Sequence, residues 1–220
     1  RGCLVDLEAQ YLSEIQVPSE IGNGLESILN KLIETISKLS ARAKPNQKIW
    51  GVGIGVAGLI NHETGVVENS PDFDWKNVNL EELIKDRIPF PFFYDNSTRL
   101  MAKGEKELGR YKKESNFAII NVGYGIATGL VVNDSLLYGD KGFTGEIGHI
   151  QIQPNSKIKC ECGKYGCLEA LASGRRIAEM GQERLLVENI QEIKELAGLK
   201  KENITAKIVF QAALAGDREA

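Results

Sequence analysis

The run IWGVGIGVAG, residues 49–58, is apolar or glycine at every position and carries no charge. Such a short uncharged run is typical of a strand that is buried in a sheet. Before it, between Gly24 and Ala43, leucines and isoleucines recur at steps of three and four residues, which predicts an amphipathic helix that packs on this sheet. After it, the run FPFFYD, residues 90–95, predicts another strand that ends in polar residues. Strands that alternate with helices in this way indicate an α/β fold with a mixed sheet.

The same alternation continues along the rest of the chain. Two hairpins are predicted where short apolar runs flank a polar turn, one over residues 2–17 and one over residues 126–139, which turns at Asn133 and Asp134. Helices are predicted over residues 24–43, 96–108, 177–186 and 190–196, and from Thr205 onward.

The composition is that of a globular protein. With 220 residues, 42% of them hydrophobic and 26% charged, the chain can bury a sizeable core. A net charge of -3 and an isoelectric point near 5.6 do not provide the clustered basic surface that neutralises the phosphates of a nucleic acid. The sequence has no run of about 18 apolar residues, the length that a membrane-spanning helix needs. Its amino terminus has neither the basic region nor the apolar region of a targeting signal. We therefore expect a cytoplasmic protein.

Three of the four cysteines are clustered, at Cys160, Cys162 and Cys167. In a chain without secretory features, such clustering favours metal binding over disulfide formation. Zinc prefers four sulfur or nitrogen ligands in a tetrahedron, and His149 can fold back to supply the fourth. We predict one structural zinc ion at these four residues. Buried free thiols beside a core histidine, or a redox-active dithiol, are the alternatives.

Two further features suggest a ligand site beside the cysteines. The glycine-rich stretch Gly123–Gly129 can place backbone N–H groups against a phosphate, although tight hairpins use glycine in the same way. Glu146 stands three residues before His149, and Glu169 stands two residues after Cys167. Carboxylates that are held in place beside a metal site can accept hydrogen bonds from the hydroxyl groups of a sugar. From these residues alone, carboxylates on the surface at helix ends are an equal alternative.

Four stretches of the sequence resemble the ROK family of sugar-recognising repressors and kinases. They are GVGIGVAGLINHETGVVENS (51–70), YDNSTRLMAKGE (94–105), NVGYGIATGLVVNDSLLYGDKGFTGEIGH (121–149) and CECGKYGCLEALASG (160–174). The resemblance implies an actin-like, ribonuclease-H-like fold of two α/β lobes with mixed sheets and the sugar in the cleft. We expect a fragment of that fold: an N-terminal lobe over residues 1–95 without its first strand, and a larger lobe over residues 96–220 without its C-terminal part.

The resemblance also implies roles for individual residues. The zinc ligands would be His149, Cys160, Cys162 and Cys167. The sugar ligands would be Gly58, Asn96, Glu146, His149 and Glu169.

Two positions depart from the pattern of the family's kinases. The kinases carry Glu-Asn-Asp where this chain has DNS, residues 95–97, so Ser97 replaces the aspartate that acts as general base. A serine hydroxyl does not accept a proton from a sugar hydroxyl at neutral pH unless another base activates it. The Gly-Thr-Gly turn that contacts phosphate in the kinases is here Gly123, Tyr124 and Gly125, which puts a bulky ring beside the nucleotide position.

These departures predict a sugar-binding effector domain of a transcriptional regulator, a repressor of carbohydrate metabolism, without a catalytic residue. A helix-turn-helix domain upstream of residue 1 would bind DNA, and the protein would act as a homodimer or homotetramer whose conformation responds to the sugar. The alternative is an ATP-dependent hexose or N-acetylhexosamine kinase, similar to glucokinases, in which Asp95 substitutes for the missing base.

Overall fold

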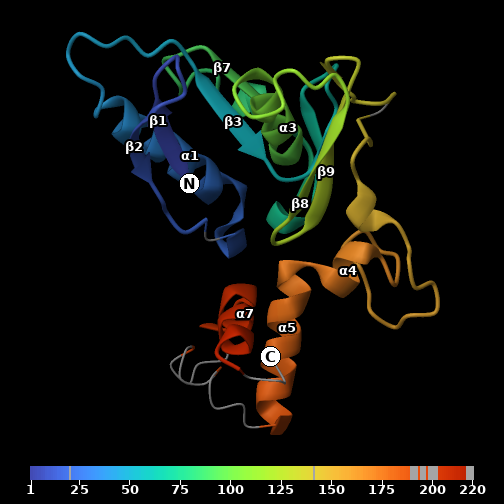
Figure 1. Cartoon of the computed structure of the whole chain (residues 1–220). Helices are drawn as coiled ribbons and strands as arrows, with labels where there is room; N and C mark the ends of the chain where they lie inside the picture. Colours follow the sequence, from blue (N-terminus) through green and yellow to red (C-terminus); the bar gives the residue numbers. More distant parts are fainter. Residues whose placement is uncertain (20, 141, 189–192, 194–196, 198–202, 217–220) are drawn as a thin grey trace. The chain divides into compact units, whose positions relative to one another are not determined.

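Strands and helices alternate along the chain in a computed structural model, so the predicted α/β fold is confirmed (Figure 1). The structure describes residues 1–19, 21–140, 142–188, 193, 197 and 203–216. Two compact units are present: unit 1 consists of Arg1–Ile119 with Gly129–Thr144, and unit 2 of Ile120–Thr128 with Gly145–Ala220. The lobe boundary predicted after residue 95 falls inside a strand of unit 1, and the division of the complete fold into two lobes stays a prediction.

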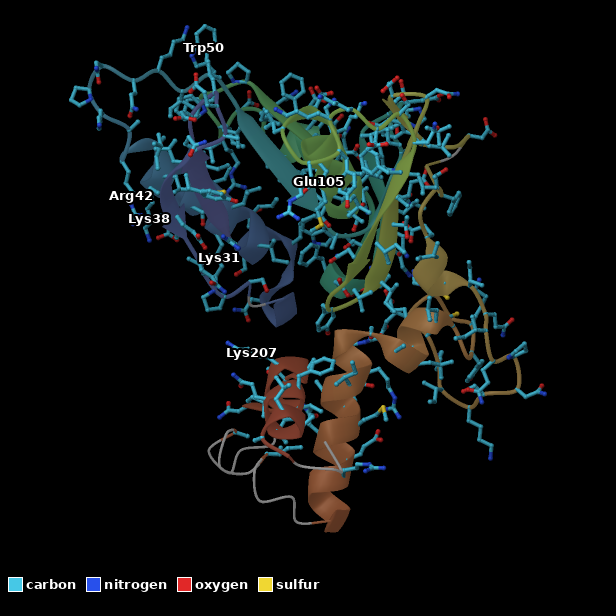
Figure 2. The ribbon with its side chains drawn as sticks, in the orientation of Figure 1. Lys31, Lys38, Arg42, Trp50, Glu105 and Lys207 are labelled. Atoms are coloured by element: carbon cyan, nitrogen blue, oxygen red, sulfur yellow. The ribbon has the colours of Figure 1, made fainter. Side chains whose placement is uncertain are left out.

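Unit 1 begins with the first predicted hairpin. Strand β1 (Gly2–Val5) pairs antiparallel with β2 (Tyr11–Ile15). Helix α1 (Gly24–Ser40) follows; its Leu29 side chain is fully buried, whereas exposed polar side chains such as Lys38 cover its outer side (Figure 2). Unit 1 contains a cleft of about 600 Å³. It is lined by strand β1, the end of α1 and the segment around residues 47–53. The strand that we expect to precede residue 1 stays a prediction.

The uncharged run at residues 49–58 contains β3 (Val52–Val56), which pairs in parallel with β7 (Phe92–Asn96). Ile54 and Val56 point into the core of unit 1, because alternate residues of a strand face opposite sides. The same core contains the buried side chains of Leu29, Ile60, Val67, Trp75, Leu80, Ile84 and Ile88.

Short elements surround this parallel pair. A three-stranded antiparallel sheet has the order β4 (Leu59–Ile60), β5 (Val66–Ser70) and β6 (Trp75–Asn79). The helices of this region are η1 (Ile21–Asn23), η2 (Pro71–Phe73), α2 (Leu80–Ile84) and α3 (Ser97–Glu107), the last of which directly follows β7.

A further sheet has the order β10-β9-β8, and its strands are β8 (Phe117–Val122), β9 (Ile126–Val132) and β10 (Ser135–Leu136). The predicted turn between β9 and β10 is confirmed, because Asn133 and Asp134 both have positive φ angles, 50° and 65°. Two consecutive residues of this kind form the tight hairpin turn that matches the twist of the strands. Strands β8 and β9 contribute residues to both units.

Unit 2 is mainly helical beyond its strand residues. Its elements are η3 (Ile147–His149), α4 (Leu168–Ala172), α5 (Gly174–Glu188) and α7 (Ala206–Leu214). The predicted start of α7 is confirmed, since the Thr205 hydroxyl accepts a hydrogen bond from Ile208 N. The helix predicted over residues 190–196 lies outside the described residues, apart from residue 193. Among the helices described here, none combines the length and the apolar character needed to cross a membrane.

Candidate functional site

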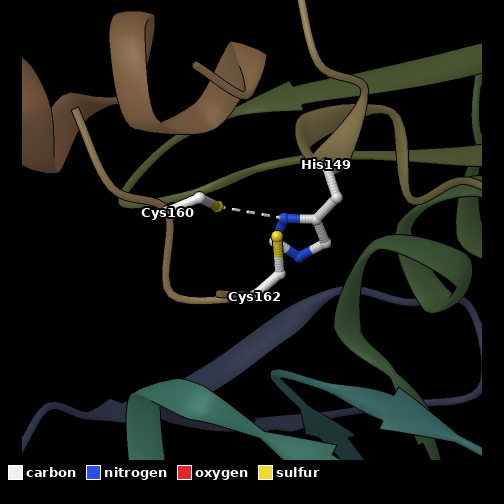
Figure 3. A group of neighbouring side chains, drawn as sticks. All are labelled: His149, Cys160 and Cys162. Atoms are coloured by element: carbon white, nitrogen blue, oxygen red, sulfur yellow. Dashed lines mark hydrogen bonds between the residues drawn. The ribbon is translucent and has the colours of Figure 1, made fainter. Parts of the chain in front are cut away.

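Three of the predicted metal ligands lie together in unit 2. His149 ends η3, and Cys160 and Cys162 lie on the loop between η3 and α4 (Figure 3). Their donor atoms are all within 4.8 Å of one another, and His149 Nδ1 is 3.5 Å from Cys160 Sγ. Cys167, the predicted fourth ligand, is fully buried, and its Sγ atom lies 3.7 Å from Cys162 Sγ. The structure therefore gathers three of the four residues and places the fourth sulfur beside them.

Two of the separations in this cluster are those expected around a tetrahedral metal ion. Zinc bonds of about 2.3 Å to sulfur and about 2.0 Å to nitrogen put tetrahedral donors about 3.5–3.8 Å apart. The His149–Cys160 and Cys162–Cys167 distances of 3.5 Å and 3.7 Å lie in this range. The cysteines are free thiols rather than a disulfide. Both the donor types and their spacing are consistent with a zinc site.

The surroundings of the three clustered cysteines shift the pKa values of their thiols in different directions. Burial raises the pKa of Cys160 to about 12, and burial also raises the pKa of Cys167. Burial acts in the same direction on Cys162, but hydrogen bonds from the Lys164 backbone N–H and the two neighbouring thiols outweigh it, and the pKa of Cys162 is lowered. A redox-active dithiol relies on an accessible thiolate, whereas two of these thiols are buried. The burial of Cys160 and Cys167 therefore disfavours a redox-active dithiol made of these two residues.

His149 faces the cysteines with one ring nitrogen and a carboxylate with the other. Its Nδ1 atom lies toward Cys160, and its Nε2 atom is 3.7 Å from Glu146 Oε2. Gly148 packs closely against β9, since a Cβ atom there would lie 2.2 Å from the Ile126 carbonyl oxygen. The Gly-Glu-Ile-Gly-His pattern thus brings a carboxylate, which is a hydrogen-bond acceptor, beside the candidate metal ligands.

Glu169 connects the cysteine loop to the glycine-rich turn. It lies in the first turn of α4, two residues after Cys167, and its Oε2 atom accepts a hydrogen bond of 2.8 Å from Ile126 N. Ile126 directly follows the Gly123–Gly125 turn. The structure therefore places Glu169 beside the turn as well as beside the cysteines, and at least one of its oxygens is bonded within the protein.

In unit 1, Asn96 is fixed at the start of α3. Its Oδ1 atom accepts hydrogen bonds from Thr98 N and Arg99 N at 2.9 Å and 3.1 Å, which caps the helix, and its Nδ2 atom donates to Gly58 O at 2.9 Å. An amide NH₂ group has two donor hydrogens, and the bond to Gly58 O uses one of them. Gly58 and Asn96, two predicted sugar ligands, are therefore bonded to each other.

Arg99 is a residue of this region that the sequence analysis missed. Its guanidinium donates to Asp95 Oδ1, Ile60 O and Gly142 O at 2.9–3.1 Å, and it packs over the ring of Tyr138 at 5.1 Å. Burial, followed by the neighbouring Asp95 carboxylate, raises the pKa of Tyr138. The one sequence signal is the spacing of Asp95 and Arg99 by four residues, which is common on helix surfaces. The pair instead spans the junction of β7 and α3, where Arg99 is buried and Asp95 is mostly buried.

The predicted sugar ligands are divided between the two units. Gly58 and Asn96 belong to unit 1, and Glu146, His149 and Glu169 belong to unit 2. Each group is clustered within its own unit, and a single sugar site that uses all five residues stays a prediction.

Gly58→Ala is expected to destabilise unit 1 and disturb Asn96. Gly58 has a φ of 132°, and a Cβ atom would lie 2.7 Å from Asn69 O and 2.8 Å from Ser70 Cβ. Strain of this kind costs about 1–3 kcal/mol of the free energy of unfolding. Urea unfolding should show this loss, whereas the control Gly53→Ala, where a Cβ atom has no neighbour within 4 Å, should stay near wild type. Equal free energies of unfolding for the two variants would show that position 58 does not require glycine.

The model of the ROK family matches residues 1–220. The chain belongs to the ROK family. The resemblance on which the expected fold and site residues rest is therefore confirmed at the level of the family.

Repressors and kinases of the ROK family are equally similar to the chain. The xylose repressor of Caldicellulosiruptor bescii is 34% identical over 98% of this chain and 53% of its own length. The glucokinase of Thermotoga maritima is 34% identical over 98% of this chain and 66% of its own length. The crystal structure of a ROK family glucokinase from Streptomyces griseus, in complex with glucose and AMPPNP, matches with a TM-score of 0.87 at 27% identity, over 99% of this chain and 68% of that one. The chain thus spans about half to two thirds of the curated relatives it matches.

Proposed function

We propose that this ROK chain is the sugar-binding effector domain of a transcriptional regulator rather than a kinase. The observation that carries the proposal is Ser97, which stands where the family's kinases have their general base. The neighbouring Asp95 does not offer an open substitute, because its Oδ1 atom accepts hydrogen bonds from Arg99 Nε and Asn96 N at 2.9 Å and 2.7 Å. Tyr124, in place of a small hydroxyl residue, is a second departure that disfavours phosphoryl transfer.

The sugar is proposed to bind through Gly58, Asn96, Glu146, His149 and Glu169. A sugar that binds one of two conformations more tightly shifts the protein toward that conformation, and no chemical step is needed. An upstream helix-turn-helix domain in a cytoplasmic homodimer or homotetramer would read this shift as a change in DNA affinity.

The second part of the proposal is a structural zinc ion held by His149, Cys160, Cys162 and Cys167. The supporting observations are the donor types and the two donor separations, 3.5 Å and 3.7 Å, that match a tetrahedral zinc ion. A bound zinc ion would fix the histidine ring, whose other nitrogen lies near Glu146. Loss of the metal is therefore expected to weaken sugar binding as well as stability.

An ATP-dependent hexose or N-acetylhexosamine kinase is the second candidate. It is favoured by the 34% identity to the Thermotoga maritima glucokinase, which equals the identity to the xylose repressor. In this case Asp95 would have to act as the base despite its bonds to Arg99.

The regulatory proposal predicts that a sugar changes the DNA affinity of the full-length protein. DNA affinity would be measured by fluorescence anisotropy with labelled DNA from upstream of the protein's gene. The measurement would be repeated in the presence of pentoses, hexoses and N-acetylhexosamines. We expect one sugar to change the affinity about 5–150-fold, the usual range for coupled sites, and Glu146→Gln to reduce the response. The exposed Glu8→Gln is a matched charge control that should respond like wild type. DNA binding that ignores every sugar would contradict the proposal.

A further inference from the structure

Residues beside the metal ligands connect the cysteine loop to α5. Glu161 stands between Cys160 and Cys162, and its carboxylate forms an ion pair with the guanidinium of Arg175 near the start of α5. The Arg175 side chain is only 20% exposed, whereas Glu161 is about half exposed. The arginine is therefore the more buried member of the pair, and the cysteine loop contacts α5 at this point.

The same end of α5 holds the Gly123–Gly125 turn. The backbone N–H groups of Gly174 and Arg175 donate to Gly123 O at 2.8 Å and to Tyr124 O at 3.2 Å. The first N–H groups of a helix have no acceptor within the helix, so the turn supplies the acceptors they need. Arg175 thus contacts the cysteine loop through its side chain and the turn through its backbone.

A second connection reaches the turn from α4. Glu169, two residues after Cys167, accepts the 2.8 Å hydrogen bond from Ile126 N, the residue that follows the turn. Hydrogen bonds to an ionised carboxylate are shorter and stronger than those between neutral groups. The turn is therefore held by Glu169, which is two residues from Cys167, and by Arg175, whose side chain contacts the cysteine loop.

We propose that Glu161, Arg175 and Glu169, named here the knot clamp, transmit the order of the metal-bound cysteine loop to the Gly123–Gly125 turn. Metal loading then fixes the conformation of this turn and of Tyr124, a residue that is 62% exposed. The members of the clamp are positioning residues. The inference rests on the proposed zinc site and extends it, because the effect of the metal reaches a segment that supplies no metal ligand.

Hydrogen–deuterium exchange of the full-length protein tests the clamp. The turn peptide, residues 122–127, and a reference peptide in α7 are compared in zinc-loaded and chelated protein. Chelation is expected to raise the exchange of the turn amides about tenfold, as the loss of a charge-assisted hydrogen bond would. With zinc still bound, Arg175→Gln and Glu161→Gln are each expected to raise it about threefold, because a half-exposed ion pair is weak.

Arg176→Gln is the matched control. Arg176 is the next residue of α5, and it forms ion pairs with Glu179 and Glu183 on the same helix. It should leave the turn unchanged. An effect of Arg175→Gln that does not exceed that of Arg176→Gln overturns the clamp.

Metal analysis separates the clamp from the zinc proposal. If one zinc per chain is measured and its removal leaves the turn unchanged, the clamp is wrong and the zinc site stands. If no zinc is found, the zinc site and its effect on the turn are wrong. If chelation also deprotects α7, unit 2 has unfolded, and the zinc-loaded Arg175→Gln protein decides: an effect above that of Arg176→Gln supports the clamp, and an equal effect rejects it.

Discussion

Replacing Cys167 with serine is expected to reduce the zinc content from one ion per chain to a small fraction of that value and to destabilise unit 2. Cys167 is fully buried beside Cys162, and a serine hydroxyl is a poor zinc ligand. Structural zinc contributes about 10–16 kcal/mol in zinc-finger peptides, as much as the whole stability of a typical domain. Metal analysis by mass spectrometry and thermal unfolding followed by circular dichroism would measure the two effects.

Cys3→Ser is the control for this experiment. Cys3 is an exposed free cysteine on β1 in unit 1, away from the cluster in the sequence and in a different unit. Its replacement should change neither the zinc content nor the unfolding temperature. A wild-type protein that is fully folded without metal would refute the zinc site, as would Cys167→Ser protein with full zinc content.

Arg99→Ala is expected to lower the free energy of unfolding by about 3–5 kcal/mol, the usual cost of removing one partner from a buried ion pair. The side chains of Arg99 and Asp95 are 4% and 14% exposed, and their closest distance is 2.7 Å. The substitution also leaves the carbonyl oxygens of Ile60 and Gly142 without this donor. Urea unfolding can be followed by tryptophan fluorescence, since Trp75 is buried in the core of unit 1.

Two further variants sharpen this measurement. Arg99→Lys keeps the charge but cannot form the planar fork of hydrogen bonds, so an intermediate loss is expected. Arg42→Ala removes an exposed arginine beyond the end of α1, which donates to Ser13 Oγ and Glu14 O, and should cost less than about 1 kcal/mol (Figure 2). If Arg99→Ala were no more destabilised than Arg42→Ala, the buried pair would not have the role assigned to it.

The elements with a clear hydrophobic period were predictable from the sequence. The helix predicted over residues 24–43 and the strand predicted over residues 49–58 correspond to α1 and β3. The predicted start of a helix at Asn96 is confirmed as the cap of α3. These features depend on neighbours in the sequence, and local patterns therefore carry enough information.

Contacts between distant segments were not predictable in the same way. Arg99 bonds the carbonyl oxygens of Ile60 and Gly142, which lie 39 and 43 residues away, and backbone carbonyls leave no mark in the sequence. The composition of unit 2, which joins Ile120–Thr128 to Gly145–Ala220, also depends on long-range packing.

The candidate site depends partly on local sequence patterns, which were predictable, and partly on contacts between distant segments, which were not. The spacing of the cysteines predicted a set of metal ligands, and the gathering of Cys160 and Cys162 with His149 is confirmed. The glycine-rich stretch left phosphate binding and a tight hairpin open. The structure adds that the Gly123–Gly125 turn supplies acceptors to the start of α5. This contact depends on Gly174 and Arg175, which local periodicity does not identify, because it predicted the helix only from residue 177.

The absence of kinase activity is the central claim, and a coupled assay of ADP release by the full-length protein tests it most directly. The protein would be incubated with ATP, magnesium and each sugar that stabilises it in thermal unfolding. We expect sugar binding with ADP release at the background rate, because Ser97 replaces the base and Asp95 is bonded to Arg99. Sugar-dependent ADP release that Asp95→Asn abolishes would contradict it.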